Sequence, residues 1–217
     1  MTDIHDLTVD PVWLLEAEQT LIAFHDLLAT DGLQRGLIGP REVPRLWPRH
    51  LRNCLCVADP GVGLLGTGAK VADLGSGAGL PGLVWALARP DVAVTLVEPL
   101  QRRTTFLQEA VASLGLGDRV TIVQARAQDV PALAQDVVTS RALAPLAAVV
   151  EWSLPHLRPG GELLAIKGGK ASKELSEARE SIASMGGRSP AIVRLGPMDA
   201  DGQPLATVVR VVKGGTA

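Results

Sequence analysis

The chain of 217 residues is 47% hydrophobic and 20% charged, with a formal net charge of −2 at pH 7. Length and composition fit one globular domain with a small extension, and they exclude a repeat protein, a low-complexity chain and a uniformly basic nucleic-acid binder. The opening MTDIHDLTVD is acidic where a signal peptide would be basic, and charges interrupt every apolar run before it could span a bilayer. We therefore expect a cytoplasmic protein with no membrane partner.

Charge is distributed unevenly along the first quarter of the chain. Residues 1–34 hold seven acidic side chains and no Lys or Arg, whereas five arginines and a single acid follow in residues 35–52. Such a basic segment suits an anionic partner, since phosphate contacts dominate nucleic-acid affinity, but it is equally compatible with a solvated surface. The arginines of this segment are Arg35, Arg41, Arg45, Arg49 and Arg52.

Helices are predicted for most of this N-terminal part. Leucine and isoleucine recur at helical spacing among acids over residues 11–30, which indicates an amphipathic helix. Residues 39–58 predict one or two short helices, broken near Pro44 and Pro48. The glycine-rich stretch DPGVGLLGTG, residues 59–68, then marks the boundary between a helical extension, residues 1–62, and the main domain, residues 63–217.

Cysteine and histidine are scattered rather than clustered. Cys54 and Cys56 are the only cysteines, and the four histidines are far apart in the sequence. With no second cysteine cluster, neither a disulfide framework nor a zinc site is indicated. We expect two buried thiols and no metal.

Strand and helix patterns alternate in the main domain. Apolar runs predict strands at 69–75, 92–98, 119–125, 136–141 and 161–168, with helices at 81–89, 102–115, 145–157 and 173–186. This order predicts an α/β fold with a doubly wound, Rossmann-like parallel sheet. The last two apolar runs, 191–197 and 205–213, have no helical pattern between them and predict an antiparallel hairpin.

The stretch VADLGSGAGLPG, residues 71–82, fits two glycine fingerprints, one for dinucleotides and one for S-adenosylmethionine (SAM). Asp73 lies two residues before Gly75, where a carboxylate suits a cationic ligand and would repel a pyrophosphate. Glu98 ends the second predicted strand, where a carboxylate can bind ribose hydroxyls in either kind of site. The chain has no tyrosine, and no histidine between residues 51 and 155, so hydride transfer lacks proton-relay groups. SAM is therefore the favoured ligand.

The absence of two sequence features excludes some classes of methyl acceptor. The fourth predicted strand leads into VVTSRALAPL, which lacks the D/N-P-P-Y/F motif that positions exocyclic amines. No cysteine follows the glycine loop, which removes the nucleophile required for methylation at carbon 5 of a pyrimidine. Ring nitrogens, oxygens and small molecules remain as acceptors.

The motif set as a whole resembles the bacterial 16S rRNA guanine-N7 methyltransferase family called RsmG or GidB. The residues that carry the resemblance are WPRHLRN, DLGSGAGLPG, TLVEPLQRRTTFL, ARAQD, TSRALAPL and LLAIKGG, and they span residues 13–170 approximately. The resemblance implies a class I SAM-dependent methyltransferase fold, SAM as donor, and N7 of guanine 527 of 16S rRNA as acceptor. Its partner would be 16S rRNA or the small ribosomal subunit particle. The sequence leaves the oligomeric state open, with a monomer favoured.

The resemblance also implies site residues. The methionine end of SAM is expected at the acid and glycine loop, the ribose at Glu98, and the adenine at Ala127 and Gln128, while Arg141 would lie near both donor and target base as the catalytic residue. The loop residues are Asp73, Gly75, Ser76, Gly77 and Leu80. Gln128 departs from the glutamate that is common in the family, which leaves the adenine contact open because the amide keeps the length and loses the charge.

RNA contacts are expected from cations near the rim of the cofactor site. These candidates are Arg49, His50, Arg102, Arg103, Lys167 and Lys170. Two alternatives to an rRNA methyltransferase remain at this point. One is a small-molecule O-methyltransferase, and the other is a ribosome-assembly protein that binds RNA without catalysis.

Overall fold

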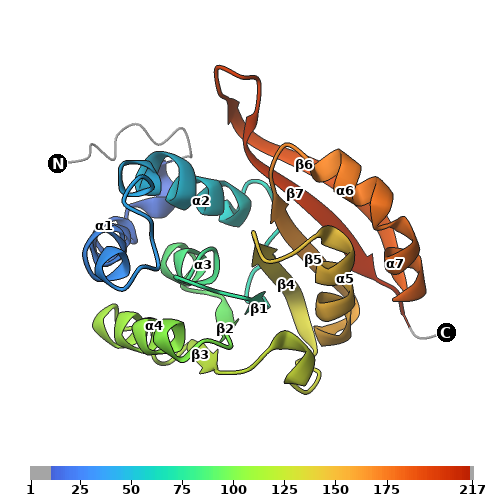
Figure 1. The fold of residues 1–217 in the computed structure, drawn as a ribbon, viewed down its shortest axis with the longest axis horizontal. Coiled ribbons are helices and arrows are strands. Elements are labelled where there is room, and N and C mark those ends of the chain that lie inside the picture. Colours follow the sequence, from blue (N-terminus) through green and yellow to red (C-terminus); the bar gives the residue numbers. More distant parts are fainter. Residues whose placement is uncertain (1–10, 216–217) are drawn as a thin grey trace.

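The computed structural model describes residues 11–215, so the acidic opening segment, on which the signal-peptide argument rests, lies outside the described residues. A seven-stranded sheet in the order β3-β2-β1-β4-β5-β7-β6 has helices on both faces (Figure 1). Its strands are β1 (Lys70–Leu74), β2 (Ala93–Val97), β3 (Val120–Val123), β4 (Gln135–Arg141), β5 (Leu157–Lys167), β6 (Gly187–Met198) and β7 (Pro204–Lys213). The predicted doubly wound α/β fold is confirmed.

Strand direction divides the sheet into two parts. Strands β1 to β5 run parallel, and β7 pairs antiparallel with both β5 and β6. The predicted C-terminal hairpin is therefore confirmed. Because β7 runs against β5, with Lys167 opposite Thr207, the turn between β6 and β7 lies at the edge of the sheet where β4 and β5 end. Loops from both parts of the chain meet at that edge.

Two helical layers bury the two faces of the sheet. The helices are α1 (Glu18–Leu27), α2 (Arg52–Ala58), α3 (Gly82–Ala88), α4 (Gln101–Ser113), α5 (Leu146–Ser153), α6 (Ala171–Glu177) and α7 (Arg179–Ser184). The first four cover one face, and α5 to α7 cover the other. Adjacent residues of one strand, such as Val71 and Ala72, enter opposite cores. Burial on both faces explains why these strands are apolar runs rather than alternating patterns.

The N-terminal helices are more broken than the sequence predicts. Residues 11–30 form a 3₁₀ turn, Pro11–Leu14, then α1, then a π-helical turn that begins at Leu28. In the next predicted helical segment, Pro44 lies in a 3₁₀ turn and Pro48 in a π-helical turn, Leu46–Leu51, that leads directly into α2. Proline removes a backbone donor, so these irregular turns fall where the α-helical pattern would lose a hydrogen bond.

The extension and the main domain share one hydrophobic core. Leu21, Phe24 and Leu55 belong to the same buried cluster as Trp85. The Trp85 indole Nε1 donates to the Cys54 carbonyl at 2.9 Å, which ties α2 to α3. Cys54 and Cys56 are both free and buried, as predicted. The boundary proposed near residue 62 therefore separates two segments of chain but not two separate cores.

None of the helices within residues 11–215 has the length and apolar character needed to cross a membrane.

Candidate active site: a glycine loop beside a charged cleft

The glycine loop follows β1 and has a backbone that few other residues adopt. Gly75, Gly77 and Gly79 have φ angles of +69°, +58° and +90°. A Cβ on Gly75 would also overlap the Leu143 side chain, which lies on the loop after β4. The amide of Gly75 donates to the Val97 carbonyl at 2.8 Å, so the loop is fixed against the end of β2. Glycine is needed here for both conformation and space.

Asp73 is fully buried at the end of β1, directly beneath this loop. Its Oδ2 accepts the Gly82 amide at 2.9 Å, and its Oδ1 has no hydrogen-bond partner. Burial raises the pKa of Asp73 to about 7, against the lowering effect of the Gly82 hydrogen bond. An incompletely paired buried carboxylate is stabilised by a cation nearby. The sulfonium and ammonium of SAM supply such charge, so these residues fit the predicted cofactor.

Glu98 lies one residue beyond β2 and is 1% exposed. Its Oε2 accepts the Gly77 amide at 3.0 Å, and its Oε1 accepts the Leu100 amide at 3.0 Å. Arg103 on α4 approaches the same carboxylate at 3.5 Å. The carboxylate thus stands at the sheet edge beside the glycine loop, at the position from which we predict the ribose contact.

The remaining predicted cofactor residues occupy the adjoining parts of this edge. Ala127 is buried in a short 3₁₀ turn after β3, and Gln128 beside it is exposed. The Ser76 hydroxyl donates to the Asp73 carbonyl at 2.8 Å and shapes the glycine turn. Leu80 is half-buried and packs against the core. Their SAM contacts remain predictions.

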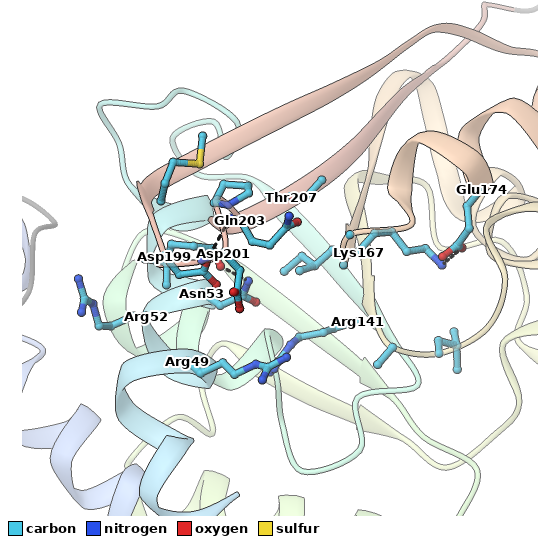
Figure 2. Close-up of a pocket in the computed structure, with 18 of the residues that line it drawn as sticks. Arg49, Arg52, Asn53, Arg141, Lys167, Glu174, Asp199, Asp201, Gln203 and Thr207 are labelled. Atoms are coloured by element: carbon cyan, nitrogen blue, oxygen red, sulfur yellow. Dashed lines mark hydrogen bonds and ion pairs between the residues drawn. The ribbon is translucent and has the colours of Figure 1, made fainter.

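A cleft of about 1090 Å³ opens over the ends of β4 and β5 (Figure 2). This volume slightly exceeds the usual range for small-molecule sites, so it can admit a nucleotide. Its walls come from four regions: the π-helical turn with α2, the loops after β4 and β5, helix α6, and the turn between β6 and β7. The charged lining residues are Arg49, Arg52, Arg141, Lys167, Glu174, Glu177, Asp199 and Asp201. The cleft is therefore lined by charges of both signs.

Arg141 ends β4, and together with Leu143 it forms the part of the cleft nearest the glycine loop. Register places Thr139 beside Asp73, so Arg141 extends two residues beyond the buried acid. In Figure 2 the Arg141 and Arg49 side chains point toward one another. One nitrogen of the Arg141 guanidinium also contacts the His50 ring. The position of Arg141 near both donor and acceptor stays a prediction.

The predicted RNA-binding residues other than Lys167 lie in three different places. Arg49 lines the cleft, and His50 is engaged with Arg141 beside it. Arg102 and Arg103 lie at the start of α4, the helix that follows Glu98, and Lys170 is exposed before α6. The cleft therefore gathers only some of these cations.

Lys167 has a different environment from the one its predicted role requires. Its side chain is 7% exposed, and its ammonium pairs with Glu174 at 2.8 Å and donates to the Ala144 carbonyl at 2.6 Å. Glu174 in turn accepts the Leu146 amide at 3.0 Å. These contacts hold the loop that carries Leu143 against α6, and they speak against a direct RNA contact by this lysine.

Sequence reasoning missed several residues of the cleft. The turn between β6 and β7 contributes Asp199, Asp201 and Gln203. Asn53 also lines the cleft, and its Nδ2 donates to the Leu205 carbonyl at 2.8 Å. The sequence identifies Arg52 only as one arginine of the basic segment 35–52, not as a residue of the site. No local motif marks these residues, because their shared location depends on the order of the strands.

Among residues 11–215, no group of three or more His, Cys, Asp or Glu side chains is placed to hold a metal ion.

Comparison with solved structures supports the fold. The fold is similar to that of a SAM-dependent O-methyltransferase from Thermotoga maritima, with a TM-score of 0.57 and 16% sequence identity; the match covers 76% of this chain and 66% of that one. It is also similar to that of a SAM-dependent methyltransferase from Aquifex aeolicus, with a TM-score of 0.55 and 18% identity; this match covers 74% of this chain and 92% of that one.

Sequence relatives are much closer. The ribosomal RNA small subunit methyltransferase G of Kineococcus radiotolerans is 51% identical over 193 residues, covering 88% of this chain and 73% of that protein. The Thermobifida fusca protein of the same name is 53% identical over 189 residues, covering 87% and 77%. The family model described as GidB, rRNA small subunit methyltransferase G, matches residues 17–199. The chain belongs to this rRNA small subunit methyltransferase G family, which is the family that its motifs resemble.

Proposed function

We propose that this chain transfers the methyl group of SAM to N7 of a guanine in small-subunit rRNA, the base numbered 527 in 16S rRNA. Membership of the family supports SAM as donor and rRNA as acceptor. The observation that carries the proposal is the position of the cleft. It adjoins the glycine loop through Leu143 and Arg141, so a base in the cleft faces the end of the sheet where the donor is expected.

The chemistry at N7 requires alignment rather than proton removal. When bound, SAM supplies an electrophilic methyl group on a cationic sulfur. N7 already carries an in-plane lone pair, so the methyl can move to it without a general base. The protein's task is then to hold the acceptor in line and to exclude water. Asp73 stabilises the cationic end of the cofactor, and the Leu143 side chain provides an apolar wall between the loop and the cleft.

The charges of the cleft suit a guanosine nucleotide in one orientation. Arg49 and Arg52 line the side formed by the extension, where they can bind phosphate. Arg141 can donate to O6, the acceptor next to N7, since arginine commonly binds this edge of guanine. Guanine's N1–H and N2 amine are donors on the side of the base away from N7, and Asp199 and Asp201 lie on the hairpin side of the cleft, where their carboxylates can accept from them.

The finer aspects of the function are also proposals. We propose that 16S rRNA, free or within a small-subunit particle, is the partner, and that the protein acts as a monomer in the cytoplasm. The family match disfavours a small-molecule O-methyltransferase and a non-catalytic assembly protein. No described contact favours either alternative.

Transfer of tritium from labelled SAM tests the proposal. Purified small-subunit particles, naked 16S rRNA and a metabolite extract are offered in parallel, and the labelled nucleoside is identified by mass spectrometry. We expect label in 7-methylguanosine from the RNA or the particle. An otherwise identical RNA with 7-deazaguanine at the target position serves as the matched control and should accept none. Label confined to a metabolite, or no binding of SAM at all, would overturn the proposal.

A further inference from the structure

Arg141 is held by a side chain from a distant part of the sequence. One Nη of its guanidinium donates to Nδ1 of His50, which lies 91 residues earlier in the π-helical turn Leu46–Leu51. Both side chains are partly buried. The N-terminal extension therefore reaches the end of β4 and contacts Arg141, the residue that we predict to lie near the methyl acceptor.

The other ring nitrogen of His50 is bound to a carboxylate. His50 Nε2 lies 2.6 Å from Glu42 Oε2, and the two side chains are 15% and 37% exposed. An ionised carboxylate only accepts hydrogen bonds, so Nε2 carries the ring proton. The neutral ring then has a lone pair at Nδ1, which is what the Arg141 guanidinium requires. Glu42 thus selects the tautomer that can receive Arg141.

The charged groups around His50 favour this neutral ring. Burial lowers the pKa of His50 below its usual 6.5, and Arg141 at the end of β4 and Arg49 in the same turn lower it further, while Glu42 opposes them. Burial raises the pKa of the Cys54 thiol, which faces Arg141 from α2, to about 11, so it adds no negative charge at neutral pH. A protonated ring would present an N–H and a like charge to the guanidinium.

We propose that His50 is a positioning residue that aims Arg141 at the target base, with Glu42 fixing the imidazole. This role differs from the RNA contact that the sequence predicts for His50, because both ring nitrogens are already used within the protein. The inference rests on the proposed function. It extends that function by making the helical extension part of the catalytic geometry rather than only a surface for RNA.

Two substitutions at His50 separate positioning from other roles. Glutamine can accept from Arg141 through Oε1 and donate to Glu42 through Nε2, and it does not titrate. We expect His50→Gln to keep kcat within about threefold of wild type, and His50→Ala to lower kcat about tenfold, the effect of one charge-assisted hydrogen bond. The dissociation constant of SAM and the KM for RNA should change less than twofold in both variants.

The pH profile of kcat at saturating SAM and RNA provides a second readout. Wild type should lose activity toward acidic pH, once the pH reaches the lowered pKa of His50 and the ring gains a proton and releases Arg141. Any decline that comes from Asp73 is present in both proteins, so His50→Gln should lack only the further acidic decline that comes from His50, and the difference between the two profiles reports His50. His25→Gln is the matched control, since His25 contacts Asp26 and the Trp47 ring instead. It should retain both the wild-type kcat and the acidic decline.

Two results for the His50 variants would overturn the inference. A raised KM for RNA with an unchanged kcat would make His50 an RNA contact, as the sequence predicts. Equal loss in both His50 variants, or no loss in either, would show that the hydrogen bonds to Arg141 and Glu42 do not control turnover. If His50→Ala fails to fold, His50→Gln and its pH profile still decide the question. Absence of methyl transfer by wild type itself would instead count against the proposed function.

Discussion

Gly75 shows how one residue couples the two halves of the site. Its φ of +69° and the overlap that a Cβ would make with Leu143 leave no room for a side chain. We expect Gly75→Asp to abolish SAM binding, with a loss of more than about 100-fold in affinity, because it adds strain, bulk and a like charge beside Asp73. Isothermal titration calorimetry measures the affinity.

A substitution at Gly115 distinguishes the effect of backbone strain at a glycine from the effect of its position beside the predicted cofactor site. Gly115 has nearly the same φ, +67°, and a Cβ there would meet nothing within 4 Å. Gly115→Ala should lower the free energy of unfolding by about 1 kcal/mol and leave SAM affinity unchanged. Normal SAM binding by Gly75→Asp would contradict the placement of the donor at this loop.

Asp73 predicts how SAM binding depends on pH. Its pKa of about 7 in the free protein means that the carboxylate is largely neutral at pH 6 and largely ionised at pH 8. A cationic ligand favours the ionised form, so SAM affinity should rise about tenfold from pH 6 to pH 8, and binding at pH 7 should release protons. Calorimetry in buffers of different ionisation enthalpy measures both quantities.

The stability of the free protein should change in the opposite direction. A pKa raised on folding stabilises the protein at low pH, and this contribution is lost as pH rises through about 7. The increase in Tm that SAM produces should therefore grow between pH 6 and pH 8. Asp73→Asn should remove the trend, whereas Asp91→Asn should keep it, because the pKa of Asp91 is about 2. A flat profile in wild type would mean that Asp73 does not face the cofactor's charge.

At the scale of elements, Arg89 fastens the extension to the main domain. Arg89 is 4% exposed. Its guanidinium donates to the Ala58 carbonyl at the end of α2 at 3.2 Å. It also donates to two carbonyls of the connector, that of Leu65 at 3.0 Å and that of Gly66 at 3.4 Å. It also pairs with Asp91 at 2.8 Å. The glycine-rich connector is therefore fixed by hydrogen bonds although its composition suggests a flexible boundary.

Removal of this guanidinium should be costly for folding. We expect Arg89→Met to lower the free energy of unfolding by about 2–4 kcal/mol, since three carbonyls and a carboxylate lose their donor. Urea denaturation measures the change. Arg158→Met is the control, because its pair with Asp136 is half-exposed and should contribute no more than about 1 kcal/mol. Similar losses in both variants would mean that the Arg89 contacts do not hold the extension.

At the scale of the whole molecule, attraction to RNA has to be local because the net charge is −2. Arg49 lies on the cleft rim, whereas Arg179 is exposed on α7 in the opposite helical layer. If Arg49 binds one phosphate, Arg49→Ala should reduce the slope of log affinity against log salt by about 1. Filter binding of the target RNA across salt concentrations measures it. Arg179→Ala should leave the slope unchanged, and identical slopes for both variants would remove Arg49 from the RNA interface.

Features encoded in contiguous residues could be predicted from the sequence by itself. Strands β1 to β5 are apolar because both faces of the sheet are covered, and the glycine loop with Asp73 forms one strand-turn-helix unit. Glu98 follows the next strand in the chain. The fold class, the cofactor and the family could be predicted from such patterns, because each pattern lies within one contiguous stretch of sequence.

Only the tertiary structure decided which distant side chains meet. Arg141 contacts His50, Lys167 pairs with Glu174, and the hairpin turn with Asp199 forms a wall of the cleft. All of these residues come to one edge of the sheet because β4, β5 and β7 are neighbours in the strand order. That order results from how helices pack on the two faces, and no stretch of sequence specifies it locally.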